Sequence, residues 1–119
     1  MSEHDTRDCI FCKIVKREVP TPLEYEDDHV VAFKDINPQA PVHFLVIPKK
    51  HIPKIGDLTE EDRGLLDQMT SAAKHLAQKL GIDETGYRLV INSGDNGGQT
   101  VYHLHVHVLG GRFMRWPPG

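Results

Sequence analysis

Hydrophobic residues recur in five short segments of the chain with the spacing that is typical of β-strands. The segment 42–48 is almost entirely apolar and ends at Pro48, so we expect a strand that is buried on both faces at the centre of a sheet. The prolines within 37–41 break the preceding strand, because proline has no N–H group to donate to a neighbouring strand. The five expected strands cover residues 23–26, 29–35, 42–48, 87–92 and 102–109.

Two other segments carry hydrophobic residues at helical spacing. Residues 10–18 place three of them on one side, and Pro20 and Pro22 end this short helix. A long helix is expected to begin at Thr59, a favourable N-cap followed by three acidic residues, and to end at Gly81. Its apolar face consists of Leu65, Leu66, Met69, Ala72, Ala73, Leu76 and Leu80. Five strands with one long and one short helix predict an α+β fold with a mainly antiparallel sheet.

Length and charge limit the domain organisation and the partners. The chain has 119 residues, so we expect a flexible N-terminal tail at 1–8 followed by a single domain at 9–119. With 14 Lys and Arg against 17 Asp and Glu, the net charge of -3 gives no general attraction to nucleic acid. No apolar run approaches the ~20 residues of a membrane span, and the N-terminus lacks the apolar core of a signal peptide. We therefore expect a cytoplasmic protein that binds neither nucleic acid nor membranes.

Three of the eight histidines occupy every second position in the segment YHLHVHVLGG. Because successive side chains of a strand point to opposite faces, His103, His105 and His107 should share one face, and the hydrophobic residues between them should face the core. Alternate residues of a strand lie about 6.6 Å apart, so protonating all three imidazoles is costly and at least one pKa should be lowered. A neutral imidazole can act as a nucleophile, a base or a metal ligand, and the row alone leaves these roles open.

A glycine-rich loop at 93–100 directly precedes the histidine row. Its three glycines let backbone N–H groups approach an anion closely, and its Ser, Asn, Gln and Thr side chains add further donors. By itself the loop would be interpreted as a plain hairpin connection. Its position next to the histidine row favours phosphate chemistry instead.

The two cysteines, Cys9 and Cys12, form a single Cys-x-x-Cys pair. In a reducing compartment such a pair indicates half of a metal site or a redox pair rather than a structural disulfide. A tetrahedral metal site would need two further ligands.

Several sequence motifs of the chain resemble those of a known family. YHLHVHVLGG matches the His-x-His-x-His-x-x pattern, with each x apolar, of the histidine triad (HIT) superfamily. The segments FKDINPQAPVHFLVIPKKHI, GYRLVINSGDNGGQTVYHLHVHVLGGR and RWPPG resemble its Hint branch, the purine nucleoside phosphoramidases. The resemblance covers nearly the whole chain and implies a HIT-like fold.

The activity that the resemblance implies is hydrolysis of purine nucleoside 5′-phosphoramidates or aminoacyl adenylates. The substrate would be a purine nucleotide of the AMP or GMP type, a nucleotidyl-histidine would form, and the nucleoside monophosphate would be released. The chemistry would require no cofactor. A dinucleoside polyphosphate hydrolase and a nucleotide- or zinc-binding adaptor with incidental turnover are the alternative functions.

The same resemblance implies roles for individual residues. His105 would attack the α-phosphorus, and His107 would contact the phosphate and assist the leaving amine. His103 would orient His105 through a hydrogen-bond relay that includes His43. The residues implied in nucleotide binding are Ile14, Phe33, Asp35, Ile36, Asn92, Gly98, Gln99, Thr100, His105, His107 and Trp116.

Asp35 has two interpretations. The resemblance implies that its carboxylate accepts hydrogen bonds from the ribose hydroxyls. An aspartate before Ile36-Asn37-Pro38 is also typical of a residue that caps a turn.

A structural zinc ion and a homodimer are also implied. HIT relatives that carry the cysteine pair complete a zinc site with two histidines, so the ligands here would be Cys9, Cys12, His51 and His103, with free thiols as the alternative. In the homodimer two five-stranded sheets would join into one ten-stranded sheet. Trp116 of one subunit would then lie near the substrate pocket of the other.

Overall fold

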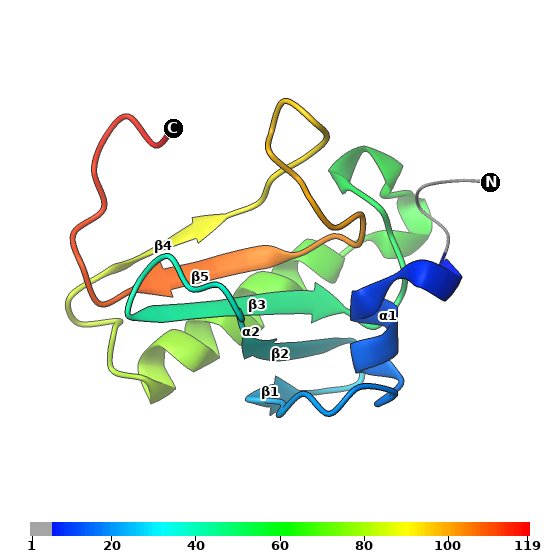
Figure 1. Ribbon diagram of the computed structural model, residues 1–119, viewed down its shortest axis with the longest axis horizontal. Helices are drawn as coiled ribbons and strands as arrows, with labels where there is room; N and C mark the ends of the chain where they lie inside the picture. The colour runs from blue at the N-terminus through cyan, green and yellow to red at the C-terminus, as the bar shows by residue number, and fades with distance from the viewer. Residues whose placement is uncertain (1–5) are drawn as a thin grey trace.

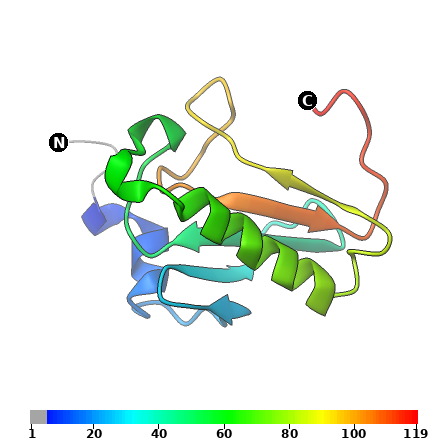
Figure 2. The ribbon, with the colours of Figure 1, turned by 180° about the vertical axis from the view of Figure 1, so that it is seen from behind.

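One antiparallel sheet lies between two helices of unequal length in the computed structural model, which describes residues 6–119 (Figure 1). Helix α2 crosses one face of the sheet, and Figure 2 shows it in front of the strands. The short helix α1 lies on the opposite face. The elements in chain order are η1 (Thr6–Asp8), α1 (Ile10–Val15), β1 (Tyr25–Glu26), β2 (Val30–Lys34), β3 (Val42–Pro48), η2 (Ile55–Asp57), η3 (Glu60–Asp62), α2 (Leu65–Lys79), β4 (Tyr87–Val90) and β5 (Val106–Gly110).

The five strands are arranged in the order β1-β2-β3-β5-β4, and every neighbouring pair is antiparallel. The predicted α+β class with a five-stranded antiparallel sheet is therefore confirmed. Strand β3 is central, as its apolar sequence predicted, and it pairs with β2 on one side and with β5 on the other. In the β3–β5 pair, Leu45 lies opposite His107 and His43 opposite Leu109, which brings two distant histidines close together.

The sheet buries both of its faces. Side chains that alternate along β3 enter two different hydrophobic clusters, because Phe44 and Val46 pack on the α2 side and Leu45 and Ile47 on the α1 side. The α2 side is the larger cluster, with Met69 and other helix residues fully buried against the strands. The α1 side is smaller and includes Cys9, Phe11, Cys12, Ile14 and Phe33. This second cluster borders the histidine row.

The prediction that the long helix begins at Thr59 is wrong. Thr59 caps only the short 3-10 helix η3, where its backbone N–H donates to the carboxylate of Asp62. Gly64 follows with a positive φ of 89°, a conformation that does not occur within a right-handed helix, so α2 begins at Leu65. The first helix is also shorter than predicted, because Arg17 adopts a positive φ after the C-cap at Lys16.

Four of the predicted strands are shorter in the structure, the last of them shifted so that it ends at Gly110 and not at residue 109, whereas 42–48 has the predicted bounds. The last strand begins at Val106 instead of residue 102, so His103 and His105 lie in the segment that leads into it. Part of the predicted N-terminal tail, residues 1–5, lies outside the described residues, and Thr6–Asp8 forms a 3-10 turn. Among residues 6–119, no helix has both the length and the apolar character that crossing a membrane requires.

Candidate active site and metal cluster

The histidine row keeps its predicted alternation although only its last part is a strand. Leu104, Val106 and Val108 are fully buried in the α2-side cluster. The imidazoles of His103 and His105 lie on the α1 side, where the Phe11 ring meets both edge-to-face at centroid distances of 5.9 and 5.2 Å. The hydrophobic face thus anchors the segment and places the three imidazoles on the α1 side of the sheet.

His105 is held with one ring nitrogen facing its own backbone. The Nδ1 atom lies 2.8 Å from the carbonyl oxygen of His103, which can only accept, so Nδ1 carries the proton. The Nε2 atom of the neutral ring then has a free lone pair. Burial lowers the pKa of His105 and favours this neutral form. The residue is therefore poised as a nitrogen nucleophile.

His107 and His43 form a hydrogen-bonded pair across the β3–β5 interface. Nε2 of His43 lies 2.9 Å from Nδ1 of His107, and Nδ1 of His43 accepts the backbone N–H of Gln39 at 3.0 Å. Because Nδ1 of His43 accepts, its proton lies on Nε2 and is donated to His107. The neutral His107 ring consequently carries its own proton on Nε2, where it is available as a donor.

Asp35 completes this group. Its Oδ2 atom lies 3.3 Å from Nε2 of His43 and 4.0 Å from Nδ1 of His107. Its other oxygen, Oδ1, accepts the backbone N–H of Asn37 at 2.9 Å. The turn-capping interpretation of Asp35 therefore describes a bond that is present, and Oδ2 faces the histidine pair.

Burial is the main influence on the titration of these imidazoles. It is the largest cause that lowers the pKa of His107 to about 4, and the neighbouring His105 and His43 lower it further. Burial also lowers the pKa of His43, against the opposing charge of Asp35. The expectation that at least one imidazole pKa is lowered is confirmed, with burial as a larger cause than crowding.

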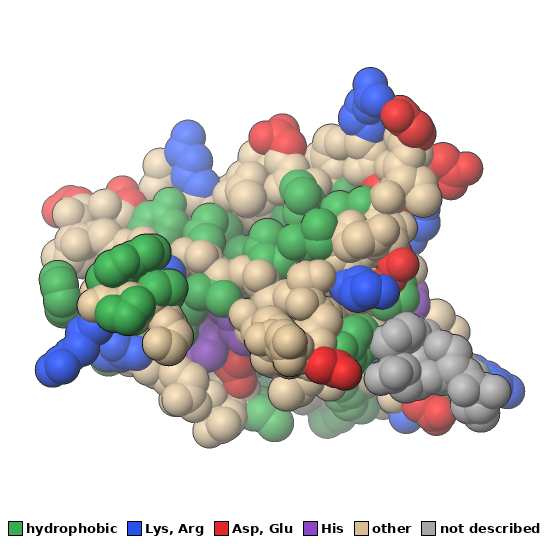
Figure 3. Space-filling model, turned by 90° about the horizontal axis from the view of Figure 1, so that it is seen from above, with side chains coloured by type: hydrophobic (Ala, Val, Ile, Leu, Met, Phe, Trp, Pro, Cys, Tyr) green, Lys and Arg blue, Asp and Glu red, His purple; other side chains and the backbone are tan. Residues whose placement is uncertain are grey.

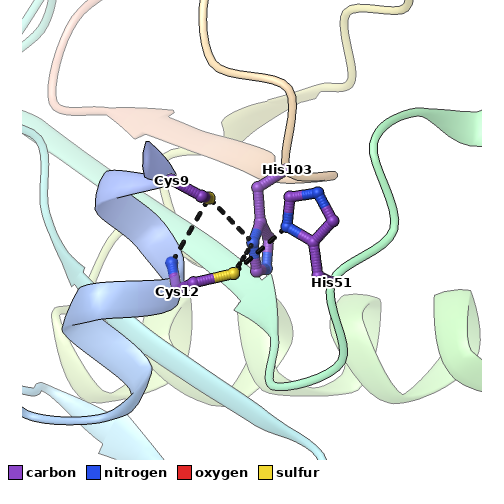
Figure 4. Close-up of side chains that lie close together, drawn as sticks. All are labelled: Cys9, Cys12, His51 and His103. Atoms are coloured by element: carbon purple, nitrogen blue, oxygen red, sulfur yellow. Dashed lines mark hydrogen bonds between the residues drawn. The ribbon is translucent and has the colours of Figure 1, made fainter. Parts of the chain in front are cut away.

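The four residues predicted to bind zinc gather at one point, although they come from three parts of the chain (Figure 4). One ligand atom from each of Cys9, Cys12, His51 and His103 lies within 4.8 Å of all the others. Figure 4 shows both thiols directed at the two imidazole rings. Nδ1 of His103 is 3.4 and 3.5 Å from the two sulfur atoms, and Nδ1 of His51 is 3.1 Å from that of Cys12.

These donors fit a tetrahedral zinc site. Sulfur and nitrogen ligands at zinc bond lengths lie about 3.5 Å apart along a tetrahedral edge, close to the spacings in the cluster. His103 directs Nε2 to the carbonyl oxygen of Pro48 at 2.8 Å, which fixes the proton there and leaves the Nδ1 lone pair toward the thiols. Burial and the hydrogen bond to the Cys9 side chain raise the pKa of the Cys12 thiol to about 12, so a bound cation would be needed to ionise this thiol.

A second group of metal-binding side chains, Asp35, His43 and His107, is arranged differently. His43 uses its Nδ1 lone pair to accept the N–H of Gln39, so its Nε2 atom carries a proton and has no lone pair for a metal. The hydrogen bonds thus separate the two groups. In the cysteine cluster, Nδ1 of His103 has a lone pair that can bind a metal ion. In the Asp35 group, Nε2 of His43 carries a proton that is donated to His107.

The loop before the histidine row is shaped by its own hydrogen bonds. The buried side-chain amide of Gln99 donates to the carbonyls of Pro53 and Val101 and accepts the N–H of Gly94. The backbone N–H groups of Gly98 and Gln99 donate to Asp95 and Gly94. A side chain at Gly97 would lie 2.6 Å from the Ser93 carbonyl oxygen, so glycine is required for this tight turn.

These bonds change the expected role of Gln99. Both its backbone and its side-chain donors are engaged within the protein, so its direct effect is on the shape of the loop. Thr100 is exposed, and no hydrogen bond among the described residues involves its hydroxyl. Of the three predicted phosphate-binding residues in this loop, Thr100 is the one that retains a free side-chain donor.

The remaining predicted nucleotide-binding residues are only partly gathered. Ile14 and Phe33 are buried in the α1-side cluster, and Asn92 is half-buried. Ile36 is fully exposed, so it is not a core residue. Trp116 is 81% exposed and lies over the guanidinium of Arg88. Figure 3 shows histidine side chains at the surface on the face seen from above, close to exposed hydrophobic groups.

Four further residues belong to this site although no pattern in the sequence predicts them: Phe11, Pro48, Gln39 and Arg112. Phe11 contributes a ring against two histidines, and Pro48 contributes a carbonyl oxygen. Gln39 acts through its backbone, and Arg112 bonds to Gln39. Backbone groups and long-range contacts leave no pattern in a sequence, apart from the position of Arg112 directly after the histidine segment.

Comparison with known proteins defines the class of protein to which this fold and site belong. The sequence profile of the HIT domain matches residues 16–114, and the chain is a member of the HIT family. An uncharacterized HIT-like protein of Synechocystis sp. is 55% identical over 94% of this chain and 97% of its own length.

Solved structures agree with this assignment. The crystal structure of a HIT family hydrolase from Legionella pneumophila has a TM-score of 0.91 and 54% identity, over 94% of this chain and all of that one (100%). A histidine triad nucleotide-binding protein from Candida albicans has a TM-score of 0.79 and 33% identity, over 92% of this chain and 83% of that chain.

Proposed function

We propose that the protein is a hydrolase that cleaves the P–N bond of purine nucleoside 5′-phosphoramidates and of related aminoacyl-adenylate-type substrates. The observation that carries this proposal is the orientation of His105, whose Nδ1 proton is donated to the His103 carbonyl so that Nε2 is left as a nucleophile. The similar proteins support the class of activity, since one is described as a HIT family hydrolase and another as a nucleotide-binding protein.

The reaction proceeds in two displacements at the α-phosphorus. In the first, the Nε2 lone pair of His105 forms a P–N bond to phosphorus while the bond to the substrate amine breaks, and the departing amine gains a proton. In the second, water attacks phosphorus and gives a proton back to the group that protonated the amine, the bond to His105 breaks with its electron pair returning to Nε2, and the nucleoside monophosphate is released. A covalent intermediate divides one difficult displacement into two easier ones.

His107 is suited to assist the departing amine. Its Nδ1 atom accepts from His43, so its Nε2–H group is a donor that can bond to the phosphate or supply a proton to the leaving nitrogen. The buried His43 holds this tautomer in place. His103 orients His105 through its backbone carbonyl, while its side chain belongs to the cysteine cluster.

Nucleotide recognition is assigned to the surroundings of the histidine pair. Asp35 accepts hydrogen bonds from the ribose hydroxyls through the carboxylate that also faces His43. Ile14, Phe33 and Ile36 contact the purine, and Thr100, Gly98 and Asn92 line the phosphate side. Gln99 maintains the loop that carries two of these groups.

A structural zinc ion held by Cys9, Cys12, His51 and His103 supplies no chemistry to the reaction in this proposal. Its four ligands come from the start of α1, the segment after β3 and the histidine row. Their fixed positions keep the His103 backbone, and hence its carbonyl oxygen, against Nδ1 of His105. The protein acts as a homodimer in which Trp116 of one subunit lies near the nucleotide site of the other.

The test is turnover of a fluorogenic adenosine phosphoramidate by the wild type, His105→Ala and His75→Ala. His75 is an exposed histidine on α2, away from the site, and serves as the matched control. We expect His105→Ala to lose at least ~10³-fold in kcat/KM and His75→Ala to retain the wild-type rate. Equal rates for His105→Ala and the wild type would reject His105 as the nucleophile.

Comparison of substrates separates this function from its alternatives. Faster cleavage of diadenosine polyphosphate than of the phosphoramidate would indicate a dinucleoside polyphosphate hydrolase. Binding of AMP without turnover of either compound would indicate a nucleotide-binding adaptor.

A further inference from the structure

Two groups bear on the tautomer of the His43–His107 pair: the carboxylate of Asp35, 3.3 Å from Nε2 of His43, and the backbone N–H group of Gln39. This N–H group donates to Nδ1 of His43 at 3.0 Å and thereby places the His43 proton on Nε2, next to His107. Gln39 lies in the exposed turn between β2 and β3, where no strand pairing fixes its orientation. A second contact is therefore needed to hold it.

Arg112 provides that contact from the segment after β5. Its Nε and Nη2 atoms both donate to the carbonyl oxygen of Gln39, at 3.1 and 2.9 Å, and its Nη1 atom donates to the carbonyl of Phe113 at 3.1 Å. The guanidinium is exposed, yet three of its donors are engaged with backbone oxygens. A planar group that donates twice to one oxygen restricts the orientation of Gln39 more than a single bond would.

We propose that Arg112 is a positioning residue that fixes the tautomers of His43 and His107 by clamping Gln39. For its effect on catalysis, this inference rests on the proposed function, because His107 must present Nε2–H to the substrate. The series of hydrogen bonds leads from Arg112 to the Gln39 carbonyl, from the Gln39 N–H to His43, and from His43 to His107. Arg112 itself touches neither the nucleophile nor the reacting atoms.

The backbone conformation at Gly111 shows that the contact between Arg112 and Gln39 follows from the fold. Gly111 has a positive φ of 88°, and a side chain there would lie 2.9 Å from Cβ of Pro41, in the same turn as Gln39. Glycine is therefore needed for the segment after β5 to turn against residues 37–41. This turn brings Arg112 to the Gln39 carbonyl.

Loss of the hydrogen bonds from Arg112 to Gln39 would change which ring nitrogens of His43 and His107 carry protons. When Gln39 turns away, Nδ1 of His43 can carry the proton as well, so Nε2 is an acceptor in part of the molecules, while Asp35 still favours the Nε2–H form. In those molecules His107 would donate from Nδ1 and lose the proton on Nε2. The group that assists the leaving amine would be in the wrong protonation pattern, although the fold is unchanged.

The experiment compares the wild type with Arg112→Ala and Arg112→Lys. Long-range ¹H–¹⁵N correlation spectra of the imidazole rings identify directly which nitrogen of His43 and His107 carries the proton. Gln39→Ala is one control, because it removes only the side chain, with its Nε2 hydrogen bond to the Asn37 carbonyl, and keeps the backbone N–H and carbonyl. Arg115→Ala is a charge-matched control on the same segment, since among the described residues its guanidinium makes no bond to the 37–41 turn.

We expect the wild type and both controls to show the His43 proton on Nε2. Both Arg112 variants should show it distributed between the two nitrogens, with kcat for the phosphoramidate reduced about tenfold and KM changed less than about twofold. Unchanged tautomers in Arg112→Ala would overturn the proposal, whatever happens to the rate. A changed tautomer with an unchanged kcat would overturn its catalytic part.

Failure of the proposed function would be distinguishable from failure of the clamp. A wild type that does not cleave the phosphoramidate would refute the function. The tautomer spectra would still decide whether Arg112 controls His43, because they require no substrate.

Discussion

At the scale of single residues, the three histidines of one short segment have three different sets of partners. The side chain of His103 faces two thiols, Nδ1 of His105 faces a backbone carbonyl, and Nδ1 of His107 faces His43. The Pro48 carbonyl fixes the proton of His103 on Nε2, the His103 carbonyl fixes that of His105 on Nδ1, and the proton donated by His43 leaves that of His107 on Nε2. The row is thus a set of three individually oriented rings.

The lowered histidine pKa values predict that stability decreases as the pH falls below neutrality. An unfolded histidine has a pKa near 6.5, whereas that of folded His107 is about 4, so between these values the unfolded chain binds more protons. The contribution of His107 to the free energy of unfolding should therefore be complete above pH 6.5 and should decrease as the pH falls from 6.5 to 4. For His107 alone the loss between pH 7.5 and 5.0 is about 1–2 kcal/mol.

Urea unfolding at pH 7.5 and 5.0 measures this loss. The His107→Gln variant should show a smaller decrease than the wild type, and the exposed His75→Gln control should show the wild-type decrease. The same decrease in His107→Gln and in the wild type would contradict the assignment of the lowered pKa to His107.

Gln99 is predicted to be important for stability as well as for the loop. Replacing it with Ala would leave the carbonyl of the half-buried Pro53 and the N–H of Gly94 without their partner, at a cost of about 2 kcal/mol in the free energy of unfolding. Asn96→Ala, in an exposed position of the same loop, should change it by less than about 0.5 kcal/mol. Equal effects in chemical denaturation would show that the Gln99 network contributes little.

At the scale of secondary-structure elements, much of the fold could be predicted from hydrophobic spacing. The apolar run of 42–48 gave the bounds and the central place of β3, because a strand buried on both faces has few alternatives. The break before α2 could not be predicted, since it depends on the positive φ of Gly64 in a segment that otherwise satisfies the rules for a helix start.

The part of the candidate site that lies within the single segment 103–108 could be predicted from the sequence. Alternation along 103–108 indicated which side chains would be core and which would be imidazoles on one face. The pairing of His43 with His107 depends on the register between β3 and β5, and no local pattern specifies this register. The backbone contributions of Gln39 and Pro48 are independent of side-chain identity and so cannot be recognised from residue types.

The cysteine cluster predicts that a metal ion ties α1 to the sheet. Protein purified without a chelator should contain about one zinc per chain, and removing the zinc should lower the Tm by about 10 °C or more. Cys12→Ser should have a lowered Tm that no longer responds to the chelator. Plasma-emission analysis that finds far less than one zinc per chain would contradict the site.

At the scale of the whole molecule, large hydrophobic rings on the C-terminal segment favour association. Phe113 and Trp116 are 86% and 81% exposed, and Figure 3 shows hydrophobic side chains standing out on the surface. Burying these rings against a second copy would remove them from water. This supports the proposed homodimer.

Light scattering at micromolar concentration should therefore give the mass of two chains. Trp116 is the single tryptophan of the sequence, so its fluorescence reports on this surface without interference. Its emission should shift to longer wavelength on dilution, as the dimer dissociates and the ring enters water. A monomeric mass at micromolar concentration would contradict the dimer.

The central claim is that Nε2 of His105 becomes covalently attached to the nucleotide. Rapid mixing with adenosine 5′-phosphoramidate, an alkaline quench that preserves the P–N bond, and mass spectrometry of the digested protein test it directly. We predict an adenylyl group on His105 within the peptide that contains the histidine row, and no adduct in His105→Ala. Substrate turnover without any adduct, or an adduct on another residue, would contradict the account.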